Sequence, residues 1–279
     1  LIIEKVYNSQ DKSKFTANKF ISTLYGVGFI RRILHRIASK KLMKAFGGRI
    51  RFLGIGGSKL HIDTETFLYE GGFPYAIGYG LTETAPMAAG QIPGKCRLGS
   101  TGPAMAGVQI RLDNINPETG HGEVVINSPS VMQGYYKNPE ATAEVFTKDG
   151  WFRTGDLGEL DKDGYLYIKG RLKNMIVGAS GENIYPEDIE SVLNTYAYVS
   201  ESIVIEQDGH LVALVHYDSD AIERLKNEWM ERWEISRDKF KEKEREWEEK
   251  MEELKKDIMK YVNSKVNRFS RISEVVEEK

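Results

Sequence analysis

The chain has 279 residues, of which 41% are hydrophobic and 29% are charged, and its formal net charge is −2. This length provides one large or two ordinary domains with ample apolar material for a core, and no stretch approaches the ~20 consecutive apolar residues of a membrane-spanning helix. The single cysteine, Cys96, excludes an intramolecular disulfide framework and fits a reducing, cytoplasmic compartment, and the five histidines lack the spacing of a zinc site.

A basic segment lies near the start of the chain. Residues 13–61 contain eleven Lys and Arg and no Asp or Glu. Apolar residues within it recur near helical spacing, at Ile30, Ile33, Leu34, Ile37 and Leu42. This pattern predicts an amphipathic helix that either packs on the core with a solvated basic face, which we favour, or makes a peripheral contact with an anionic membrane through residues 12–51. We expect no nucleic-acid partner, because no known binding module accompanies the charge.

A strand, a helix and a second strand follow at the spacing of a parallel βαβ unit. They are expected at residues 50–55, 64–69 and 75–79. The first strand runs into the turn Gly56-Gly57-Ser58, and the second runs into residues 80–84. Ligands of parallel sheets bind beyond the carboxyl ends of the strands, where both turns would lie.

The second of these turns contains more side chains that could bind a ligand than the first. Tyr79, Thr82 and Glu83 place an aromatic face, a hydroxyl and a carboxylate within five residues. Such a set could stack a base, contact a phosphate and hold Mg²⁺ through oxygen. The structural alternative is a Tyr that ends a strand and a Thr-capped helix with Glu83 in its first turn. Gly56 to Ser58 offers backbone N–H groups for close approach of a nucleotide, but Gly-Gly turns are common.

Residues 96–170 are rich in Gly, Pro and short strands, which predicts a small antiparallel barrel or meander. Residues 157–169 form its clearest element, a hairpin around an Asp-Gly turn. Asp156 precedes the hairpin, whereas Arg171 and Lys173 follow it, so closure would bring unlike charges together where the chain could pivot. The carboxylate of Asp156 could accept from both hydroxyls of a ribose, or it could cap a turn.

The remainder of the chain has an α+β pattern, with a helix expected at 186–193 and strands at 201–205 and 211–216. From His210 to the end there is no Gly and no Pro, and apolar residues recur at spacings of three, four and seven. We expect a helical arm over about 220–260, either one helix or a hairpin. The arm is either a solvated structure, as its nearly balanced charges favour, or an oligomer contact.

Four ordered motifs resemble those of the adenylate-forming superfamily, which comprises acyl- and aryl-CoA synthetases, firefly luciferase and peptide-synthetase adenylation domains. The motifs are YGLTET at 79–84, GEV to GYY at 122–136, WFRTGDLG at 151–158, and GRLK with SGENIYP at 170–186. The resemblance extends over about 50–217. The chain is most similar to the long-chain fatty-acid–CoA ligases, because of FLGIGGSKL at 52–60 and the helical insertion.

The resemblance implies an α/β protein in two parts. Residues 1–170 would be the C-terminal part of the large AMP-binding domain, with a partial αβ sheet over 1–95 and a small β-barrel over 96–170. Residues 171–279 would be a mobile α+β C-terminal domain with the helical insertion. The family's pyrophosphate loop and its C-terminal catalytic Lys motif have no counterpart in this sequence, and the first residue is Leu1. We therefore expect a fragment that is inactive in adenylation by itself.

The implied reaction uses ATP and Mg²⁺ to convert a fatty acid to acyl-AMP, and the thiol of coenzyme A then displaces AMP. Two alternatives remain open at this point. The first is an enzyme that adenylates an aryl or amino acid or loads a carrier protein. The second is a non-catalytic relative that binds nucleotides or acts as a scaffold.

The resemblance also implies roles by position. Tyr79 would stack on adenine in a pocket shared with Gly80 and with Gly56, Gly57 and Ser58. Thr82 would contact the phosphate and Glu83 would bind Mg²⁺.

The remaining roles fall around the hairpin and beyond it. Asp156 would hold the ribose, and Arg171 would assist on ribose or phosphate. Lys173 would be the hinge between the domains, and Gly181 would lie where the pantetheine of coenzyme A passes.

Overall fold

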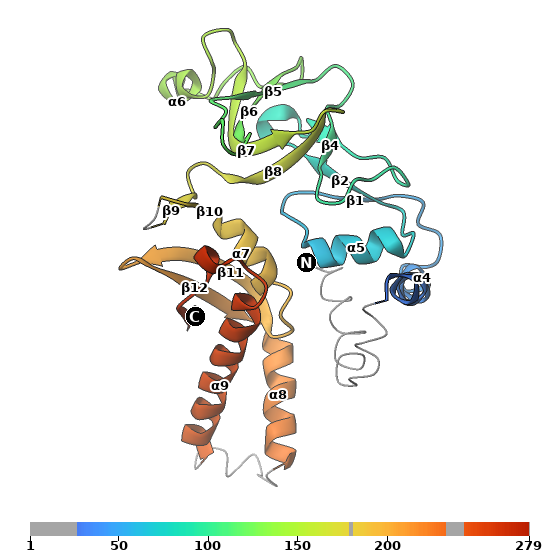
Figure 1. Ribbon diagram of the computed structural model, residues 1–279, viewed down its shortest axis with the longest axis vertical. Coiled ribbons are helices and arrows are strands. Elements are labelled where there is room, and N and C mark those ends of the chain that lie inside the picture. Colours follow the sequence, from blue (N-terminus) through green and yellow to red (C-terminus); the bar gives the residue numbers. More distant parts are fainter. Residues whose placement is uncertain (1–26, 179–180, 233–242, 279) are drawn as a thin grey trace. The chain divides into compact units, whose positions relative to one another are not determined.

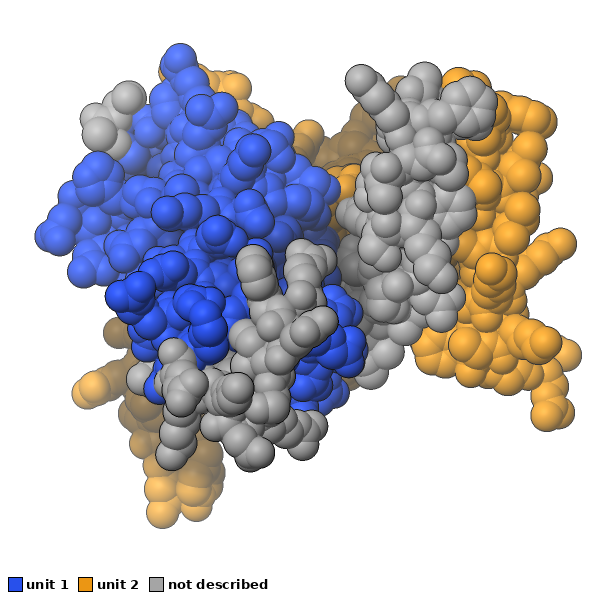
Figure 2. All heavy atoms as spheres, turned by 90° about the horizontal axis from the view of Figure 1, so that it is seen from below, with its two compact units in different colours: residues 1–13, 175–279 blue, residues 14–174 orange. Residues whose placement is uncertain are grey.

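The structure is a computed structural model that describes residues 27–178, 181–232 and 243–278 (Figure 1). The described residues form two compact units, which divide between Asn174 and Met175 (Figure 2). The N-terminal one, orange in Figure 2, is the first unit in the text, and the one that follows Asn174, blue in Figure 2, is the second unit. This division lies close to the boundary expected at 170/171, although the two-domain assignment itself stays a prediction.

The first unit begins with a helix and a strand–helix–strand segment. These elements are α4 (Gly28–Ala45), β1 (Leu53–Ile55), α5 (Ile62–Glu70) and β2 (Tyr75–Tyr79). β1 and β2 are parallel neighbours with Ile55 opposite Ile77, and the short β3 (Ala89–Gly90) pairs antiparallel with β2. The predicted βαβ unit is therefore confirmed. The carboxyl ends of β1 and β2 lie at one edge of this sheet.

Helix α5 packs through an inner face that includes Phe67 and Leu68, which are both buried. Glu65 is buried beside them, although it is a carboxylate. It accepts hydrogen bonds from the hydroxyl of Tyr75 at 3.2 Å and from the backbone N–H of Gly99 at 2.8 Å. Burial raises the pKa of Glu65, and these two donors offset part of the cost of burying the charge.

Helix α4 corrects one expectation from the sequence. Its buried residues are His35, Ser39 and Leu42. Phe29, Ile33 and Ile37 are 74%, 42% and 52% exposed. The predicted packing holds only in part: Leu42 is buried and the basic Arg32, Arg36 and Lys40 are exposed as expected, but Ile33 and Ile37 of the stripe lie on the surface. Polar contacts hold the helix as well, since Arg31 and His35 lie 2.6 and 2.8 Å from the carboxylate of Glu70 in α5. No described helix is long and apolar enough to cross a membrane.

The β-rich part of the first unit forms one five-stranded sheet. Its strands are β4 (Gly102–Pro103), β5 (Gln109–Asp113), β6 (Gly122–Asn127), β7 (Phe152–Leu160) and β8 (Tyr165–Arg171), in the order β4-β8-β7-β6-β5. All neighbouring strands are antiparallel. Val124, Ile126 and Leu166 are fully buried in its core.

This sheet is an open meander, so of the two predicted forms, a small barrel or a meander, the described residues form the meander. Its edge strands β4 and β5 do not pair with one another. β4 is only two residues long, and Pro103 has no backbone N–H to donate to a further strand. The short helices η2 (Thr82–Thr84) and α6 (Pro139–Glu144) belong to the same unit.

The predicted hairpin is confirmed as β7 and β8. Its turn is organised by Asp161, whose carboxylate accepts from the N–H groups of Asp163 and Tyr165, each at 2.9 Å. Gly164 has a φ of +80°, a conformation that favours glycine. The register places Asp156 of β7 opposite Arg171 of β8.

The second unit contains a three-stranded sheet with helices packed on it. The elements are β9 (Ile176–Val177), β10 (Asn183–Ile184), α7 (Pro186–Leu193), β11 (Val199–Gln207), β12 (His210–Tyr217), α8 (Ser219–Arg232), α9 (Glu244–Asn263), η4 (Arg268–Ser270) and β13 (Glu274–Glu277). β11 and β12 are antiparallel, and β12 and β13 are parallel. The predicted helix at 186–193 and the two predicted strands are therefore confirmed.

The predicted helical arm is a pair of helices, α8 and α9, that lie side by side (Figure 1). The rings of Trp229 and Trp247 meet across the pair, with centroids 5.7 Å apart. Leu254, Ile258 and Val262 are buried in the core of the unit. The second half of α9 is therefore part of the domain rather than a solvated arm.

Candidate functional site

Three predicted site residues from three strands meet around one carboxylate. The hydroxyl of Tyr79, at the end of β2, donates to Oδ2 of Asp156 at 2.5 Å. Nε of Arg171, at the end of β8, lies 2.9 Å from Oδ1 of the same carboxylate. Asp156 is only 4% exposed. The structure therefore brings Tyr79, Asp156 and Arg171 into direct contact.

The local backbone explains why Asp156 points to this place. Gly155 has a φ of +70°, and the register of β7 against β6 shifts between Arg153 and Leu157, so the strand is irregular at the carboxylate. The hydroxyl of Thr154 accepts from the N–H of Asp156 at 3.1 Å, and Arg171 also donates to the carbonyl of Thr154 at 3.3 Å. Thr154 thus orients both the carboxylate of Asp156 and the guanidinium of Arg171.

The hydroxyl of Tyr79 acts as the hydrogen-bond donor to Asp156. Burial, followed by the negative charge of Asp156, raises the pKa of Tyr79 well above its usual range. The hydroxyl therefore remains protonated at neutral pH. An ionised carboxylate accepts hydrogen bonds at both of its oxygens, which is the chemistry that a ribose hydroxyl requires of a binding partner.

The turn after Tyr79 is built around Gly80 and Thr84. A Cβ added to Gly80 would lie 1.7 Å from the carbonyl oxygen of Pro86, so only glycine fits. The buried hydroxyl of Thr84 accepts from the N–H of Leu81 at 3.0 Å. This arrangement leaves Thr82 exposed on the surface of the turn.

Glu83, the expected Mg²⁺ ligand, is half-buried, and residues from a loop distant in the sequence donate hydrogen bonds to it. The hydroxyl of Tyr135 donates to its Oε1 at 2.9 Å, and the N–H of Met132 donates to its backbone carbonyl at 2.8 Å. Burial, followed by the hydrogen bond to Glu83, raises the pKa of Tyr135. Tyr135 belongs to the motif at 122–136, but no spacing in the sequence indicates its contact with Glu83.

The chemistry of Glu83 fits a bound magnesium ion. The described residues contain no cluster of three or more His, Cys, Asp or Glu that could form an all-protein metal cage. Mg²⁺ is usually held by one or two carboxylates together with substrate phosphates and water. A single half-buried carboxylate beside an exposed threonine is therefore a suitable donor set.

The turn of Gly56, Gly57 and Ser58 lies at the end of β1 and is exposed. A Cβ on Gly56 would lie 3.3 Å from the carbonyl oxygen of Gly78 in β2, so this turn runs close beside the strand that ends at Tyr79. Gly57 has a φ of +88°. The two Gly-rich turns thus share the edge of the sheet at which Tyr79 lies.

Lys173 and Gly181 belong to different units. Lys173 is exposed and follows Leu172, whose N–H donates to the carbonyl of Gly155 at 2.9 Å. Gly181 lies in the second unit with a φ of +84°, next to residues outside the described ranges. The structure therefore does not test the expected place of Gly181 on the path of the pantetheine.

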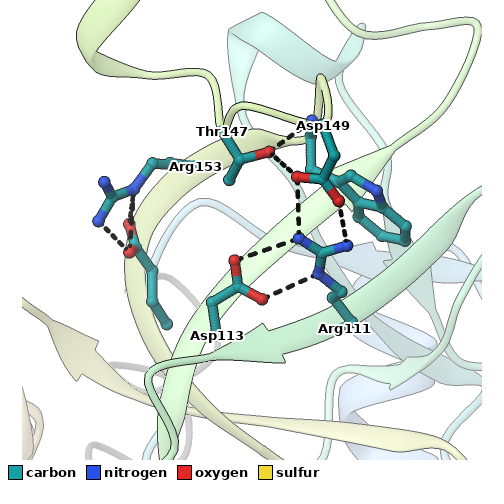
Figure 3. Close-up of polar contacts among 7 residues, drawn as sticks. Arg111, Asp113, Thr147, Asp149 and Arg153 are labelled. Carbon is teal, nitrogen blue, oxygen red and sulfur yellow. Dashed lines mark hydrogen bonds and ion pairs between the residues drawn. The ribbon is translucent and has the colours of Figure 1, made fainter.

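A polar network supports the strand that carries Asp156 (Figure 3). Nε of Arg111, in β5, lies 2.9 Å from Oδ1 of Asp113, and its Nη1 lies 2.7 Å from Oδ2 of Asp149. The guanidinium carbon of Arg111 also lies over the ring of Trp151, 4.3 Å from the ring centroid. Arg111 holds the pKa of Asp149 well below its usual range. The network ties the loop before β7 to the sheet, which fixes where β7 begins.

Comparison with known proteins agrees with this arrangement. Residues 14–136 match the protein family described as AMP-binding enzyme. The chain is 32% identical over 245 residues to long-chain-fatty-acid–CoA ligase FadD15 of Mycobacterium bovis, a match that covers 81% of this chain and 40% of the relative. The chain belongs to the adenylate-forming superfamily.

Other adenylate-forming enzymes show the same likeness. Feruloyl-CoA synthase of an Amycolatopsis species is 38% identical over 162 residues, which cover 56% of this chain and 33% of that protein. The o-succinylbenzoate CoA synthetase MenE from Bacillus subtilis, solved with the acyl-adenylate intermediate OSB-AMP, gives a TM-score of 0.62 at 25% identity over 87% of this chain and 46% of the solved one. The chain therefore spans less than half the length of these relatives.

Proposed function

We propose that this chain is part of an ATP-dependent acid–thiol ligase that activates a long-chain fatty acid as acyl-AMP and transfers the acyl group to coenzyme A. The observation that carries the proposal is the buried carboxylate of Asp156, held between Tyr79 and Arg171 at the edge where both Gly-rich turns lie. The name of the Mycobacterium bovis relative supports the long-chain substrate.

In the first step, a carboxylate oxygen of the acid attacks the α-phosphorus of ATP, and the bond from that phosphorus to pyrophosphate breaks. Asp156 would accept hydrogen bonds from the ribose hydroxyls, and Tyr79 would offer its ring to the adenine. Thr82 would donate its hydroxyl to a phosphate oxygen. Glu83 would hold Mg²⁺, whose chemistry when bound is to supply positive charge beside the phosphates. These roles amount to positioning and charge stabilisation rather than strong base catalysis.

In the second step, the thiolate of coenzyme A attacks the acyl carbon, and the bond from that carbon to the AMP oxygen breaks. We infer that Lys173 is the hinge at which the second unit changes orientation between the steps. Gly181 then leaves room for the pantetheine arm, since a glycine has no side chain to obstruct it.

The acid itself has a second candidate class. One relative is named feruloyl-CoA synthase, and feruloyl denotes an aryl acid. Its identity to this chain is 38% over 162 residues, compared with 32% over 245 residues for the fatty-acid ligase. A panel of fatty, aryl and amino acids, tested with coenzyme A and with a carrier protein on the full-length protein, separates these classes. Thioester formation only with aryl acids would overturn the fatty-acid assignment.

The nucleotide site is tested by calorimetry with AMP. We expect Asp156→Asn to weaken AMP binding about tenfold or more, because hydrogen bonds to a charged acceptor contribute roughly 1.5–3 kcal/mol. The matched control is Asp163→Asn at the turn of the same hairpin, which should bind AMP as the wild type does. Equal affinity of wild type and Asp156→Asn would overturn the site, and it would favour a scaffolding role.

A further inference from the structure

The carboxylate of Glu83 is oriented by a loop that lies far along the chain. The hydroxyl of Tyr135 donates to its Oε1 at 2.9 Å, although the two residues are separated by 52 positions. The N–H of Met132, from the same loop, donates to the backbone carbonyl of Glu83 at 2.8 Å. One loop thus fixes both the main chain and the side chain of Glu83.

The position of Tyr135 is itself set by the first turn of α6. The N–H of Tyr135 donates to the hydroxyl of Thr142 at 2.9 Å, and that hydroxyl donates to the carbonyl of Asn138 at 2.8 Å. A Cβ on Gly134 would lie 2.7 Å from the methyl carbon of Thr142, so glycine permits this close approach. The hydroxyl of Tyr135 is therefore directed at Glu83 by a built arrangement of backbone and side chains.

We propose that Tyr135 is a positioning residue that holds the Glu83 carboxylate in the orientation required to bind Mg²⁺, an inference that rests on the proposed function. The hydrogen bond engages Oε1 and thereby restricts the rotation of the carboxylate group. A neutral hydroxyl suits this role, because an ammonium or guanidinium would neutralise the carboxylate and repel the metal. Carboxylates that bind metals are commonly oriented by such hydrogen bonds.

The experiment compares Tyr135→Phe with Tyr136→Phe in the full-length protein that contains this chain. Tyr136 is the adjacent tyrosine and is 88% exposed, so its hydroxyl serves as the control. Binding of ATP is measured by calorimetry over a series of Mg²⁺ concentrations, and binding of AMP is measured without Mg²⁺. Thermal unfolding of each variant reports whether it folds.

We expect Tyr135→Phe to raise the Mg²⁺ concentration needed for half-maximal ATP binding about 10- to 100-fold, the typical effect of losing an outer hydrogen bond to a metal ligand. AMP binding without Mg²⁺ should stay within about twofold of the wild type. For Tyr136→Phe, both AMP binding and the Mg²⁺ requirement for ATP binding should stay within about twofold of the wild type. In a Glu83→Gln background, Tyr135→Phe should have little further effect on the Mg²⁺ requirement, because the two residues act as one unit.

Three other outcomes would each overturn the positioning role of Tyr135. An unchanged Mg²⁺ requirement in Tyr135→Phe, with normal ATP binding by the wild type, overturns the positioning role and leaves the proposed function intact. Equal loss of AMP and Mg²⁺-dependent ATP binding, or loss of folding, shows a general structural role for Tyr135 and also overturns it. Failure of the wild type to bind any adenine nucleotide overturns the proposed function, and this inference with it.

Discussion

At the scale of single residues, the candidate site depends on side chains whose neighbours leave them little freedom. Asp156 is buried between an aromatic donor and a guanidinium, and Thr84 closes the turn in which Thr82 and Glu83 lie. Among the described glycines, Gly80 is the one at which an added Cβ would come closest to another atom, the carbonyl oxygen of Pro86. Adding a methyl group at Gly80 is therefore expected to lower the free energy of unfolding more than most surface substitutions do.

We expect Gly80→Ala to lower the free energy of unfolding by roughly 2 kcal/mol or more, because the new methyl group would overlap the backbone of Pro86. Thermal or urea unfolding measures this loss. The control is Gly28→Ala at the start of α4, where an added Cβ meets nothing within 4 Å. Similar stability of Gly80→Ala and the wild type would contradict the described turn.

At the scale of elements, α4 and α5 are joined by charge as much as by apolar packing. Glu70 accepts from Arg31 at 2.6 and 2.9 Å and lies 2.8 Å from Nδ1 of His35. Arg31 lowers the pKa of Glu70 below its ordinary value near 4.5. This contact holds the polar face of α4 on α5 and leaves the stripe of Phe29, Ile33 and Ile37 on the surface.

The lowered pKa of Glu70 predicts a pH dependence of stability. The folded state binds fewer protons than the unfolded state at this group, so its contribution is fully present above about pH 4.5 and is lost as the pH falls through the lowered pKa. We expect Glu70→Gln to reduce stability at pH 7 by about 1–2 kcal/mol and to flatten this part of the acid dependence. Urea unfolding at pH 7 and at pH 3 measures both effects, and an unchanged acid dependence in the variant would contradict the assignment.

The exposed stripe of α4 keeps open the membrane contact predicted for the basic segment. Arg32, Arg36 and Lys40 are exposed on the same helix as Phe29, Ile33 and Ile37. We expect the chain to sediment with anionic liposomes at low salt and to be released at high salt, since Lys and Arg side chains near such a surface contribute about 1 kcal/mol each. Arg36→Glu with Lys40→Glu should weaken sedimentation, whereas Lys148→Glu should not. Binding that is absent or insensitive to salt would dismiss the contact.

At the scale of the whole molecule, the chain consists of two compact units, and Lys173 lies one residue before the last residue of the first. Its exposed side chain follows the end of β8, whose last residue, Arg171, is bound to Asp156. A backbone change at Lys173 should therefore affect how the units move rather than how the first unit binds nucleotide.

We expect Lys173→Pro in the full-length protein to leave pyrophosphate release from ATP within about twofold of the wild type, since proline restricts φ at one residue without touching Asp156. Thioester formation with coenzyme A should fall about tenfold or more, because the proposed second step uses a different orientation of the second unit. Lys173→Ala, which keeps the backbone free, is the control. Equal loss of both steps in Lys173→Pro would refute the hinge.

Elements with local signals can be predicted from the amino-acid sequence. The strand at 75–79, the helix at 186–193 and the hairpin of β7 and β8 follow from periodicity and turn residues, which act within a few positions of the chain. The superfamily was also recognisable from sequence, because its motifs are contiguous.

Only the tertiary structure decided which side chains meet. Tyr79 and Asp156 are 77 positions apart, and Glu83 and Tyr135 are 52 apart, so no local spacing could pair them. The open edges of the meander and the outward stripe of α4 also depend on packing partners distant in sequence, namely the neighbouring strands and Glu70. Contacts of this kind arise when separate elements pack together, and the pattern of any one element does not contain them.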